Sequence, residues 1–208
     1  MNMEKGKLII VRHHESEWNK LGKWTGIHDA SLTPHGVEMA QKMGEVIKDI
    51  KIDRAISSEL RRAHRTLREM LNGSGYPDLE IERSPAINER DYGDYTGRNK
   101  WEMKDLFGEE KFNGIRREWD HPVPNGETLK IVYGRVVPFY LEEILPRVLR
   151  GENTILVAHT NSIRALVKYI EEIPNEEIKN LEIPFGLFLV YEVDDSGHMI
   201  EKEIRELK

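Results

Sequence analysis

Short apolar runs along this chain are separated by amphipathic stretches. Residues 8–11 are an uninterrupted hydrophobic run, and residues 154–158 are apolar after an initial threonine, as in strands that are buried on both faces. Residues 55–56 form the core of a shorter run. Residues 187–193 and 199–204 flank a polar, Gly-containing turn and predict an antiparallel hairpin at the C-terminal end. The hydrophobic pattern therefore predicts several short strands that are far apart in the sequence.

Helical periodicity fills the intervals between these strands. One helix is expected to begin at Thr33-Pro34, which supplies an N-cap and a first-turn proline. A short helix is predicted near residues 98–106, and a long one over residues 129–145, bent at Pro138 because proline has no N–H to donate. The apolar positions with helical spacing are Val37, Ala40, Gly44 and Ile47, then Leu60, Ala63, Leu67 and Leu71, and finally Ile163, Leu166, Val167 and Ile170.

The order of these elements predicts an α/β fold, a three-layer α/β/α sandwich with a mostly parallel mixed sheet. Residues 79–83 add one more strand, whereas residues 88–93 and 116–126 are predicted to be polar loops. Repeats, low-complexity segments and Gly/Ser linkers are absent from the sequence, so we expect a single domain over residues 1–208.

Composition narrows the possible functions. The chain has 208 residues and no cysteine, which excludes disulfide and thiolate chemistry. Its formal net charge of −6 argues against a nucleic-acid partner. The apolar run that follows the N-terminus is too short for a signal peptide or a membrane span, so we expect a cytoplasmic protein without a membrane partner.

Candidate chemistry lies at two strand ends, where His13 and His159 each follow an apolar run. Ligands bind at the carboxyl ends of strands in open α/β sheets, and imidazole exchanges protons or accepts a phosphoryl group near neutral pH. Arginine and lysine recur at the other polar junctions, so a cationic pocket for a small polyanion is predicted. These cations are Arg12, Arg61, Arg62, Lys100, Arg116 and Arg117.

Other chemistries have less support. Glu89 lies in a loop where it is a candidate general acid or base. The phosphate-loop pattern, the dinucleotide fingerprint and the hydrolase elbow are all missing from the sequence. His13, His14, Glu15 and Glu17 lack the spacing of a helical zinc motif, so no metal site is expected.

The clearest motif begins at the end of the first strand. It is Arg12-His13-His14-Glu15-Ser16-Glu17-Trp18-Asn19, and it resembles the signature of the cofactor-dependent phosphoglycerate mutases of the histidine phosphatase superfamily. Further matching blocks follow in that family's order across residues 8–193. They are Thr25-Gly26, Ser58-Glu59-Leu60-Arg61-Arg62-Ala63, Asn88-Glu89-Arg90-Asp91-Tyr92-Gly93, Gly97-Arg98-Asn99-Lys100, Arg116-Arg117, Pro124-Asn125-Gly126-Glu127-Thr128-Leu129 and a block that begins at His159-Thr160-Asn161-Ser162.

The resemblance implies an enzyme that interconverts 3-phosphoglycerate and 2-phosphoglycerate in glycolysis and gluconeogenesis, primed by 2,3-bisphosphoglycerate and without a metal. It implies that His13 carries the phosphoryl group, that Arg12, Arg62 and His159 surround that group, and that Glu89 exchanges a proton with the substrate. The substrate-holding positions of the family match Ser16, Asn19, Thr25, Gly26, Tyr92, Lys100, Arg116, Arg117 and Asn161. A homo-oligomer is expected from the resemblance alone.

Three departures from the family pattern keep alternatives open. One is the stretch between Arg117 and Pro124, which is shorter than in many members, with little chain after the terminal hairpin, so a more open pocket with some phosphatase activity is expected. The chain has His14 and Thr160 at positions where the family normally has glycine, next to the two histidines. Either the local geometry compensates for these side chains or the activity is reduced or redirected, and His14 is a second candidate phosphoryl acceptor. A phosphatase acting on small phosphate esters and a non-catalytic anion-binding scaffold are the alternative functions. The matches at Lys100 and Arg116-Arg117 favour the mutase over the phosphatase.

Overall fold

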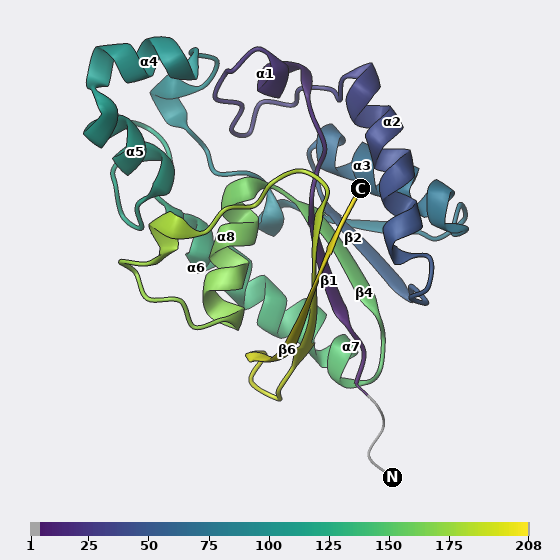
Figure 1. Ribbon diagram of the computed structural model, residues 1–208. Coiled ribbons are helices and arrows are strands. Elements are labelled where there is room, and N and C mark those ends of the chain that lie inside the picture. The colour runs from purple at the N-terminus through teal and green to yellow at the C-terminus, as the bar shows by residue number, and fades with distance from the viewer. Residues whose placement is uncertain (1–4, 208) are drawn as a thin grey trace.

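A single six-stranded sheet runs through the computed structural model, which describes residues 5–207 (Figure 1). The strands lie in the order β3-β2-β4-β1-β5-β6. β1, β2, β3 and β4 pair in parallel, whereas β5 is antiparallel to both of its neighbours. The predicted mixed, mostly parallel sheet is therefore confirmed. The strands are β1 (Leu8–Arg12), β2 (Arg54–Ser58), β3 (Ile81–Ser84), β4 (Thr154–Ala158), β5 (Leu187–Val193) and β6 (Met199–Glu206).

Helices cover both faces of the sheet, which gives the expected three layers. α2 and α3 lie on one face, and α6, α7 and α8 lie on the other, while α4 and α5 stand beyond one edge of the sheet (Figure 1). The helices are α1 (Glu17–Lys20), α2 (Pro34–Met43), α3 (Arg61–Ser74), α4 (Lys100–Phe107), α5 (Glu109–Arg117), α6 (Leu129–Phe139), α7 (Leu145–Leu149) and α8 (Thr160–Ile170).

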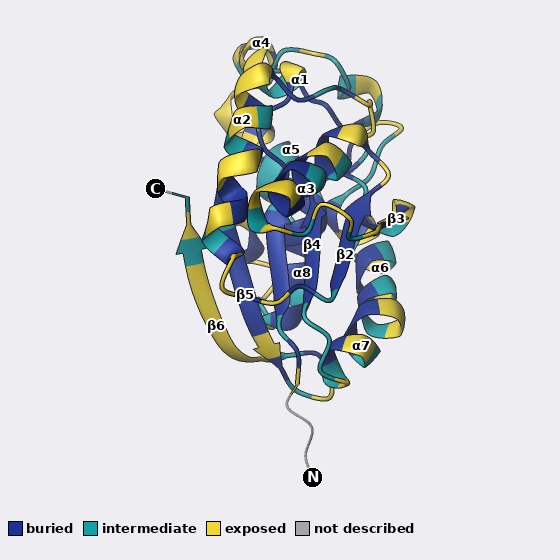
Figure 2. Cartoon of the chain, turned by 90° about the vertical axis from the view of Figure 1, so that its right-hand side faces the viewer, coloured by how far each residue is buried: buried dark blue, intermediate teal, exposed yellow. Residues whose placement is uncertain are grey.

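Successive side chains along each strand point to opposite faces of the sheet, so the hydrophobic core lies on both faces. In β1, Leu8 and Ile10 pack among the residues of α6 and α8, whereas Ile9 and Val11 pack among those of α3. Each buried aliphatic side chain contributes about 1.5–3 kcal/mol relative to an exposed one. Figure 2 shows the central strands buried between the helices, with β6 exposed at the edge.

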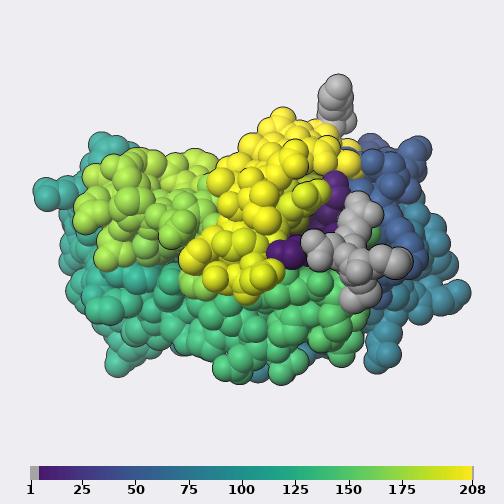
Figure 3. All heavy atoms as spheres, turned by 90° about the horizontal axis from the view of Figure 1, so that it is seen from below, coloured from purple at the N-terminus to yellow at the C-terminus, as the bar shows by residue number. Residues whose placement is uncertain are grey.

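The terminal hairpin packs beside the first strand. β5 pairs with β1 along residues 8–11, and β6 completes the predicted hairpin. Figure 3 shows the yellow hairpin against the purple start of β1. Lys5 donates to the carboxylate of Asp195 at 2.7 Å, which ties the beginning of the chain to the hairpin turn.

One helix contradicts the sequence prediction. Residues 116–126 were expected to form a loop, but Arg116 and Arg117 lie in the last turn of α5. This helix has acidic residues in its first turn and basic residues in its last turn, which matches the helix dipole. It buries Phe112 and Ile115 in a small cluster with Trp24 and Tyr92, so tertiary packing stabilises a helix that its polar sequence did not reveal.

The long helix predicted over residues 129–145 is interrupted, as expected, but not at Pro138. Pro138 lies inside α6, and a π-helical segment, Tyr140–Ile144, follows before α7 begins. There the N–H of Leu145 bonds to the carbonyl of Tyr140, five residues back. Pro146 has no N–H with which to continue the α-helical pattern at this point, so the break falls between the two prolines.

Candidate active site

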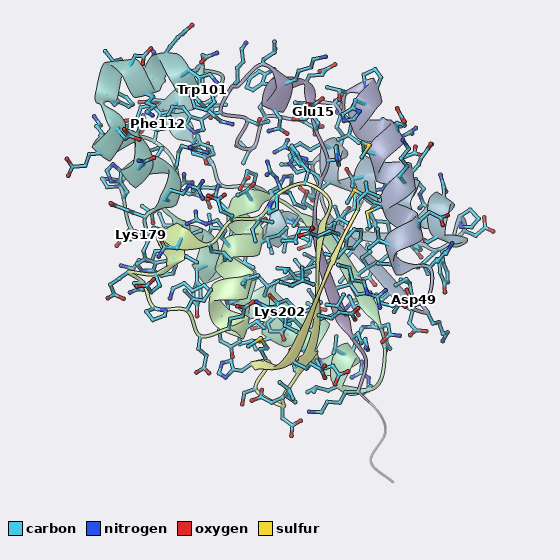
Figure 4. The ribbon with its side chains drawn as sticks, viewed as in Figure 1. Glu15, Asp49, Trp101, Phe112, Lys179 and Lys202 are labelled. Carbon is cyan, nitrogen blue, oxygen red and sulfur yellow. The ribbon has the colours of Figure 1, made fainter. Side chains whose placement is uncertain are left out.

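The parallel strands end at one edge of the sheet, where a cavity of about 130 Å³ opens. α4 and α5 carry Trp101 and Phe112 on one side of this edge, and Glu15 lies on the other side (Figure 4). Most of the residues expected to act on a ligand line the cavity. They are Arg12, His13, Asn19, Thr25, Gly26, Arg62, Glu89, Tyr92, Lys100, Arg116, Arg117 and Asn161.

His13 directly follows β1, and its backbone N–H bonds to the carbonyl of Ala158 in β4. The His13 Nδ1 atom lies 2.6 Å from the carbonyl oxygen of His14. Because a carbonyl oxygen only accepts, Nδ1 carries the proton and Nε2 keeps its lone pair. Burial, with Arg62 and Arg12 next in effect, lowers the pKa of His13 well below its usual value. His13 is therefore a neutral imidazole with a nucleophilic nitrogen at neutral pH.

Two arginines flank His13, and neither is hydrogen-bonded to a carboxylate within residues 5–207. Arg62 donates to the carbonyls of Gly26 and His28, each at 2.7 Å, and Arg12 donates to the carbonyl of Ile183 at 2.9 Å. Burial lowers the pKa of each guanidinium to about 10, so both remain charged at neutral pH. Carbonyl partners hold these cations in place while leaving their charge available to an anion.

His159 lies beside His13, with 4.9 Å between the two ring centroids, but it is not among the residues that line the cavity. Its Nε2 atom is 2.6 Å from the hydroxyl oxygen of Ser58, at the end of β2. Burial lowers the pKa of His159 well below its usual value, and Arg62 adds to this effect. The register of β1, β4 and β2 thus brings both predicted histidines to one point.

Glu89 reaches the cavity from the loop after β3. Its Oε1 atom accepts from the backbone N–H groups of Arg90, at 2.8 Å, and Asn161, at 3.1 Å. Arg135 of α6 donates to the backbone carbonyls of Asn88 and Glu89, which fixes the loop from behind. The carboxylate is therefore held in position on a rigid backbone, as acid–base chemistry requires.

Lys100, Arg116 and Arg117 form the outer wall of the cavity. Lys100 is the first residue of α4, and the two arginines end α5. Burial, followed by the charges of Arg116 and Arg12, lowers the pKa of Lys100 to about 8. Arg117 is paired with the carboxylate of Glu182 at 2.5 Å.

Two residues predicted to hold the ligand do not line the cavity. Arg61, predicted as part of the cationic pocket, is exposed and paired with Asp29 at 3.0 Å. The other is Ser16, a substrate-holding position by resemblance. It is fully buried, its hydroxyl accepts from the backbone N–H of Asn19, and its own backbone N–H donates to the side-chain oxygen of Asn19. These two bonds form a capping box at the start of α1. The structure therefore places Ser16 where it orients Asn19, which does line the cavity.

Four lining residues were not among the sequence candidates. They are Trp24, Arg164, Glu182 and Ile183. Arg164 donates to the carbonyls of Arg116, at 3.2 Å, and Arg117, at 2.6 Å, so it binds the end of α5 to α8. Its place one helical turn after Asn161 is the sequence signal for Arg164, whereas nothing in the sequence pattern points to Glu182 or Ile183.

At His14 and Thr160, where the family normally has glycine, the backbone does not adopt a conformation that only glycine favours. Among residues 5–207, the non-glycine residues with positive φ are Asn125 and Glu172, so His14 and Thr160 have ordinary backbone conformations. Thr160 begins α8 and lines the cavity. The ring of His14 instead stacks on Phe185, with 5.0 Å between centroids. Local geometry therefore accommodates both side chains.

Several buried donors on residues that line the cavity have no partner in the described part of the chain. Within residues 5–207, the Nε atoms of Arg12, Arg62 and Arg164 and the hydroxyl of Thr25 have no hydrogen-bond partner. An unsatisfied buried donor costs about 1–3 kcal/mol, and more when it is charged. Such donors on residues that line one cavity fit a phosphorylated anion with several acceptor oxygens.

The ionisation of Lys100 predicts a pH dependence of ligand capture. A protonated Lys100 attracts an anion, so kcat/KM for a phosphorylated substrate is expected to fall above the Lys100 pKa of about 8 and to stay level just below it. A pH profile of kcat/KM checks this. The Lys100→Arg variant should lose the alkaline limb near that pH, since arginine stays charged there, and an unchanged limb in this variant would assign it to another group.

No group of three or more His, Asp or Glu side chains in residues 5–207 is arranged to hold a metal ion. Across the same residues, no helix is both long enough and apolar enough to cross a membrane.

Comparison with known proteins places this geometry in a family. Residues 8–203 match the family model described as the histidine phosphatase superfamily, branch 1. The chain belongs to this superfamily. A 2,3-bisphosphoglycerate-dependent phosphoglycerate mutase of Parvibaculum lavamentivorans is 44% identical over 199 residues, which cover 95% of each chain. One of the same name from Methylocella silvestris is 39% identical, over 96% of this chain and 98% of that one.

Solved structures of other proteins share the fold of this chain. A putative alpha-ribazole-5'-P phosphatase from Escherichia coli superposes with a TM-score of 0.79 at 23% identity, over 99% of this chain and 97% of that one. YhfR of Bacillus stearothermophilus gives a TM-score of 0.81 at 21% identity, over 93% and 94% of the two chains. At these identities the likeness concerns the fold.

Proposed function

We propose that this histidine phosphatase superfamily member is a phosphoglycerate mutase, which interconverts 3-phosphoglycerate and 2-phosphoglycerate through a phosphohistidine. The observation that carries the proposal is the outer wall of Lys100, Arg116 and Arg117 beyond His13. A phosphatase needs cations only around the phosphoryl group that it removes. A mutase must also hold the carboxylate and the remainder of a substrate that is phosphorylated at either of two oxygens. The full-length relatives named as mutases support the same activity.

In this proposal, His13 already carries a phosphoryl group and passes it to the free hydroxyl of the phosphoglycerate. His13 Nε2 then attacks the phosphorus atom of the other phosphate in the bisphosphoglycerate so formed. Its lone pair is available because Nδ1 is bonded to the carbonyl of His14. Arg12 and Arg62 offset the negative charge that spreads over the phosphoryl oxygens, and His159 lies against the His13 ring. Phosphoryl transfer depends mainly on such positioning and charge stabilisation.

Glu89 is the proposed proton donor and acceptor. When phosphorylated His13 gives its group to the substrate, the attacking hydroxyl must lose a proton, and when His13 takes back the other phosphoryl group, the departing oxygen needs that proton. One oxygen of Glu89 is fixed by two backbone N–H groups. The carboxylate thus stays at the same place while the substrate turns between the two transfers.

The same cavity fits 2,3-bisphosphoglycerate as the priming ligand. This ligand supplies the phosphoryl group that first charges His13. Arg12 and Arg62 would hold the phosphate next to His13, and Lys100, Arg116 and Arg117 would hold the rest. The unpartnered guanidinium nitrogens and the hydroxyl of Thr25 give a second phosphate and a carboxylate the donors that they need.

A coupled assay tests the proposal. 3-Phosphoglycerate is supplied with and without 2,3-bisphosphoglycerate and without added metal, and 2-phosphoglycerate and inorganic phosphate are measured in parallel. Isomerisation that the bisphosphate stimulates, with little phosphate release, is expected. Phosphate release without isomerisation would establish the phosphatase alternative, and the absence of both products would favour a scaffold that only binds anions.

Glu182 is expected to compete with the substrate for Arg117. In the Glu182→Gln variant, the KM for phosphoglycerate should fall about two- to fivefold with little change in kcat, the size expected for a largely exposed ion pair. Steady-state kinetics at low and high salt checks this, because salt should shrink the difference. The matched control is Glu176→Gln, an exposed carboxylate outside the cavity. A raised KM would mean that Glu182 orients Arg117 for the ligand.

The single domain, the cytoplasmic location and the homo-oligomer stay predictions.

A further inference from the structure

A short segment before β5 lies across the wall of the cavity. This strap, residues 181–186, is held by two of the cations that the proposed function assigns to the substrate and the phosphoryl group. Arg12 donates to the carbonyl of Ile183, and Arg117 is paired with Glu182. Ile183 and Glu182 themselves line the cavity. The position of the strap therefore determines how closed the cavity is beside His13.

Phe185 anchors the strap between two side chains of the segment that carries His13. The guanidinium carbon of Arg12 lies 4.1 Å from the centre of the Phe185 ring. The ring of His14 stacks on Phe185 at 5.0 Å, with 27° between the two planes, and the ring of His35 meets His14 edge-on at 5.7 Å. Aromatic and cation–π contacts of this kind stabilise a structure by more than the burial of their apolar surface alone would.

The backbone of His14 links this stack to the nucleophile. Its N–H bonds to the hydroxyl of Thr66 at 3.1 Å, and its carbonyl accepts from His13 Nδ1. His14 is buried, so its ring fills the space between the end of β1 and the strap that a glycine would leave open. A single residue therefore contacts the strap through its side chain and orients the nucleophile through its backbone.

We propose that His14 is a positioning residue that fastens the strap over the cavity and thereby limits access of water to phosphorylated His13. This inference rests on the proposed function. In the reaction that it limits, a water oxygen bonds to phosphorus, the bond between phosphorus and Nε2 breaks, and the nitrogen recovers its lone pair. Inorganic phosphate leaves, and the proton lost by water goes to solvent. His14 thus sets what share of the phosphoenzyme transfers its phosphoryl group to phosphoglycerate and what share loses it to water.

The experiment compares three variants with the parent enzyme. His14→Ala removes the stack, His14→Phe keeps an aromatic ring, and His64→Ala changes a partly buried histidine of α3 that does not line the cavity. Each protein is labelled with radioactive 2,3-bisphosphoglycerate and freed of ligand, and the loss of label with time is followed. In parallel, amide hydrogen exchange is measured on peptides that cover the strap, and thermal unfolding shows that each variant is folded.

In His14→Ala, hydrolysis of the phosphoenzyme and exchange in the strap are both expected to rise about three- to tenfold, as loss of one aromatic pair would predict. The mutase kcat should change less than the hydrolysis rate. His14→Phe and His64→Ala should stay within about twofold of the parent, since both keep a ring stacked on Phe185. Unchanged exchange in His14→Ala would overturn the anchoring role. His14→Phe behaving like His14→Ala would overturn the stacking explanation in favour of imidazole chemistry.

The two hypotheses fail in distinguishable ways. A parent protein that forms no phosphohistidine and isomerises nothing refutes the proposed function, and with it the control of water access. The exchange measurement then still decides whether His14 anchors the strap, because it uses the unliganded protein. A normal mutase with unchanged exchange and hydrolysis in His14→Ala refutes the inference alone.

Discussion

Replacing His13 with alanine is expected to abolish acid-labile phosphorylation of the protein by 2,3-bisphosphoglycerate and to lower the mutase kcat by about 10⁴-fold or more. No other imidazole takes its place among the described residues that line the cavity. The ring of His14 is stacked on Phe185, and His159 is bonded to Ser58. Radiolabelling followed by acid treatment, together with the coupled assay, measures both effects.

His64→Ala is the matched control for this experiment, since it removes an imidazole that lies outside the cavity and should leave labelling and turnover near those of the parent. Label that persists in His13→Ala would identify another acceptor and contradict the proposed mechanism. His14 is the neighbour to examine in that case. The variant should remain folded, because the backbone bond from His13 to Ala158 does not need the side chain.

The strands were predictable because a strand that is buried on both faces appears in the sequence as a run of consecutive apolar residues. β4 was predicted at the observed residues, Thr154–Ala158, and β1 to within one residue, since their apolar runs end abruptly at polar residues. α5 was missed because its charged sequence contains Gly114, and because its N-cap residue, Gly108, has no side chain with which to cap the helix. Its stability comes from Phe112 and Ile115 packing on residues far away in the sequence, which a local pattern does not reveal.

The residues of the site likewise fall into those that the sequence predicted and those that it did not. Residues such as His13 and Lys100 occur in motifs that sequence alone brought out, and the register of the parallel strands explains why His13 and His159 meet. Glu182 and Ile183 reach the cavity only because the chain between η5 (Ile178–Asn180) and β5 crosses it. No local signal marks that path. The stack of His14 on Phe185 is equally non-local, so the sequence showed an unusual residue but not its contact.

Six cations and two carboxylates line the cavity within residues 5–207 of an acidic protein. Three of these cations, Arg12, Arg62 and Arg164, are held by backbone carbonyls rather than by carboxylates. Carbonyl dipoles stabilise a guanidinium without neutralising it, so the charge remains available for a ligand. The fold thus concentrates positive potential at one sheet edge while the overall charge of the protein stays negative.

Replacing Glu89 with glutamine is expected to lower the mutase kcat by about 10²- to 10⁴-fold, the usual contribution of a positioned acid–base group. Glutamine keeps a carbonyl oxygen for the N–H groups of Arg90 and Asn161, so the loop should hold its shape. It cannot donate a proton to a departing hydroxyl or accept one from an attacking hydroxyl. The defect should therefore be large for phosphoglycerates, whose alkoxide leaving group needs a proton, and small for an aryl phosphate whose leaving group is stable as an anion.

Labelling of His13 by donors with different leaving groups measures this difference directly. In Glu89→Gln, the rate of labelling should fall steeply as the pKa of the leaving group rises, whereas in the parent it should depend on that pKa only weakly. Glu182→Gln is the matched control, because it changes the other carboxylate among the described lining residues and should keep the weak dependence of the parent. An equal loss with every donor in Glu89→Gln would mean that Glu89 only positions the ligand. The proton would then have to come from another group, and Lys100 and Tyr92 are lining residues that carry a proton to donate.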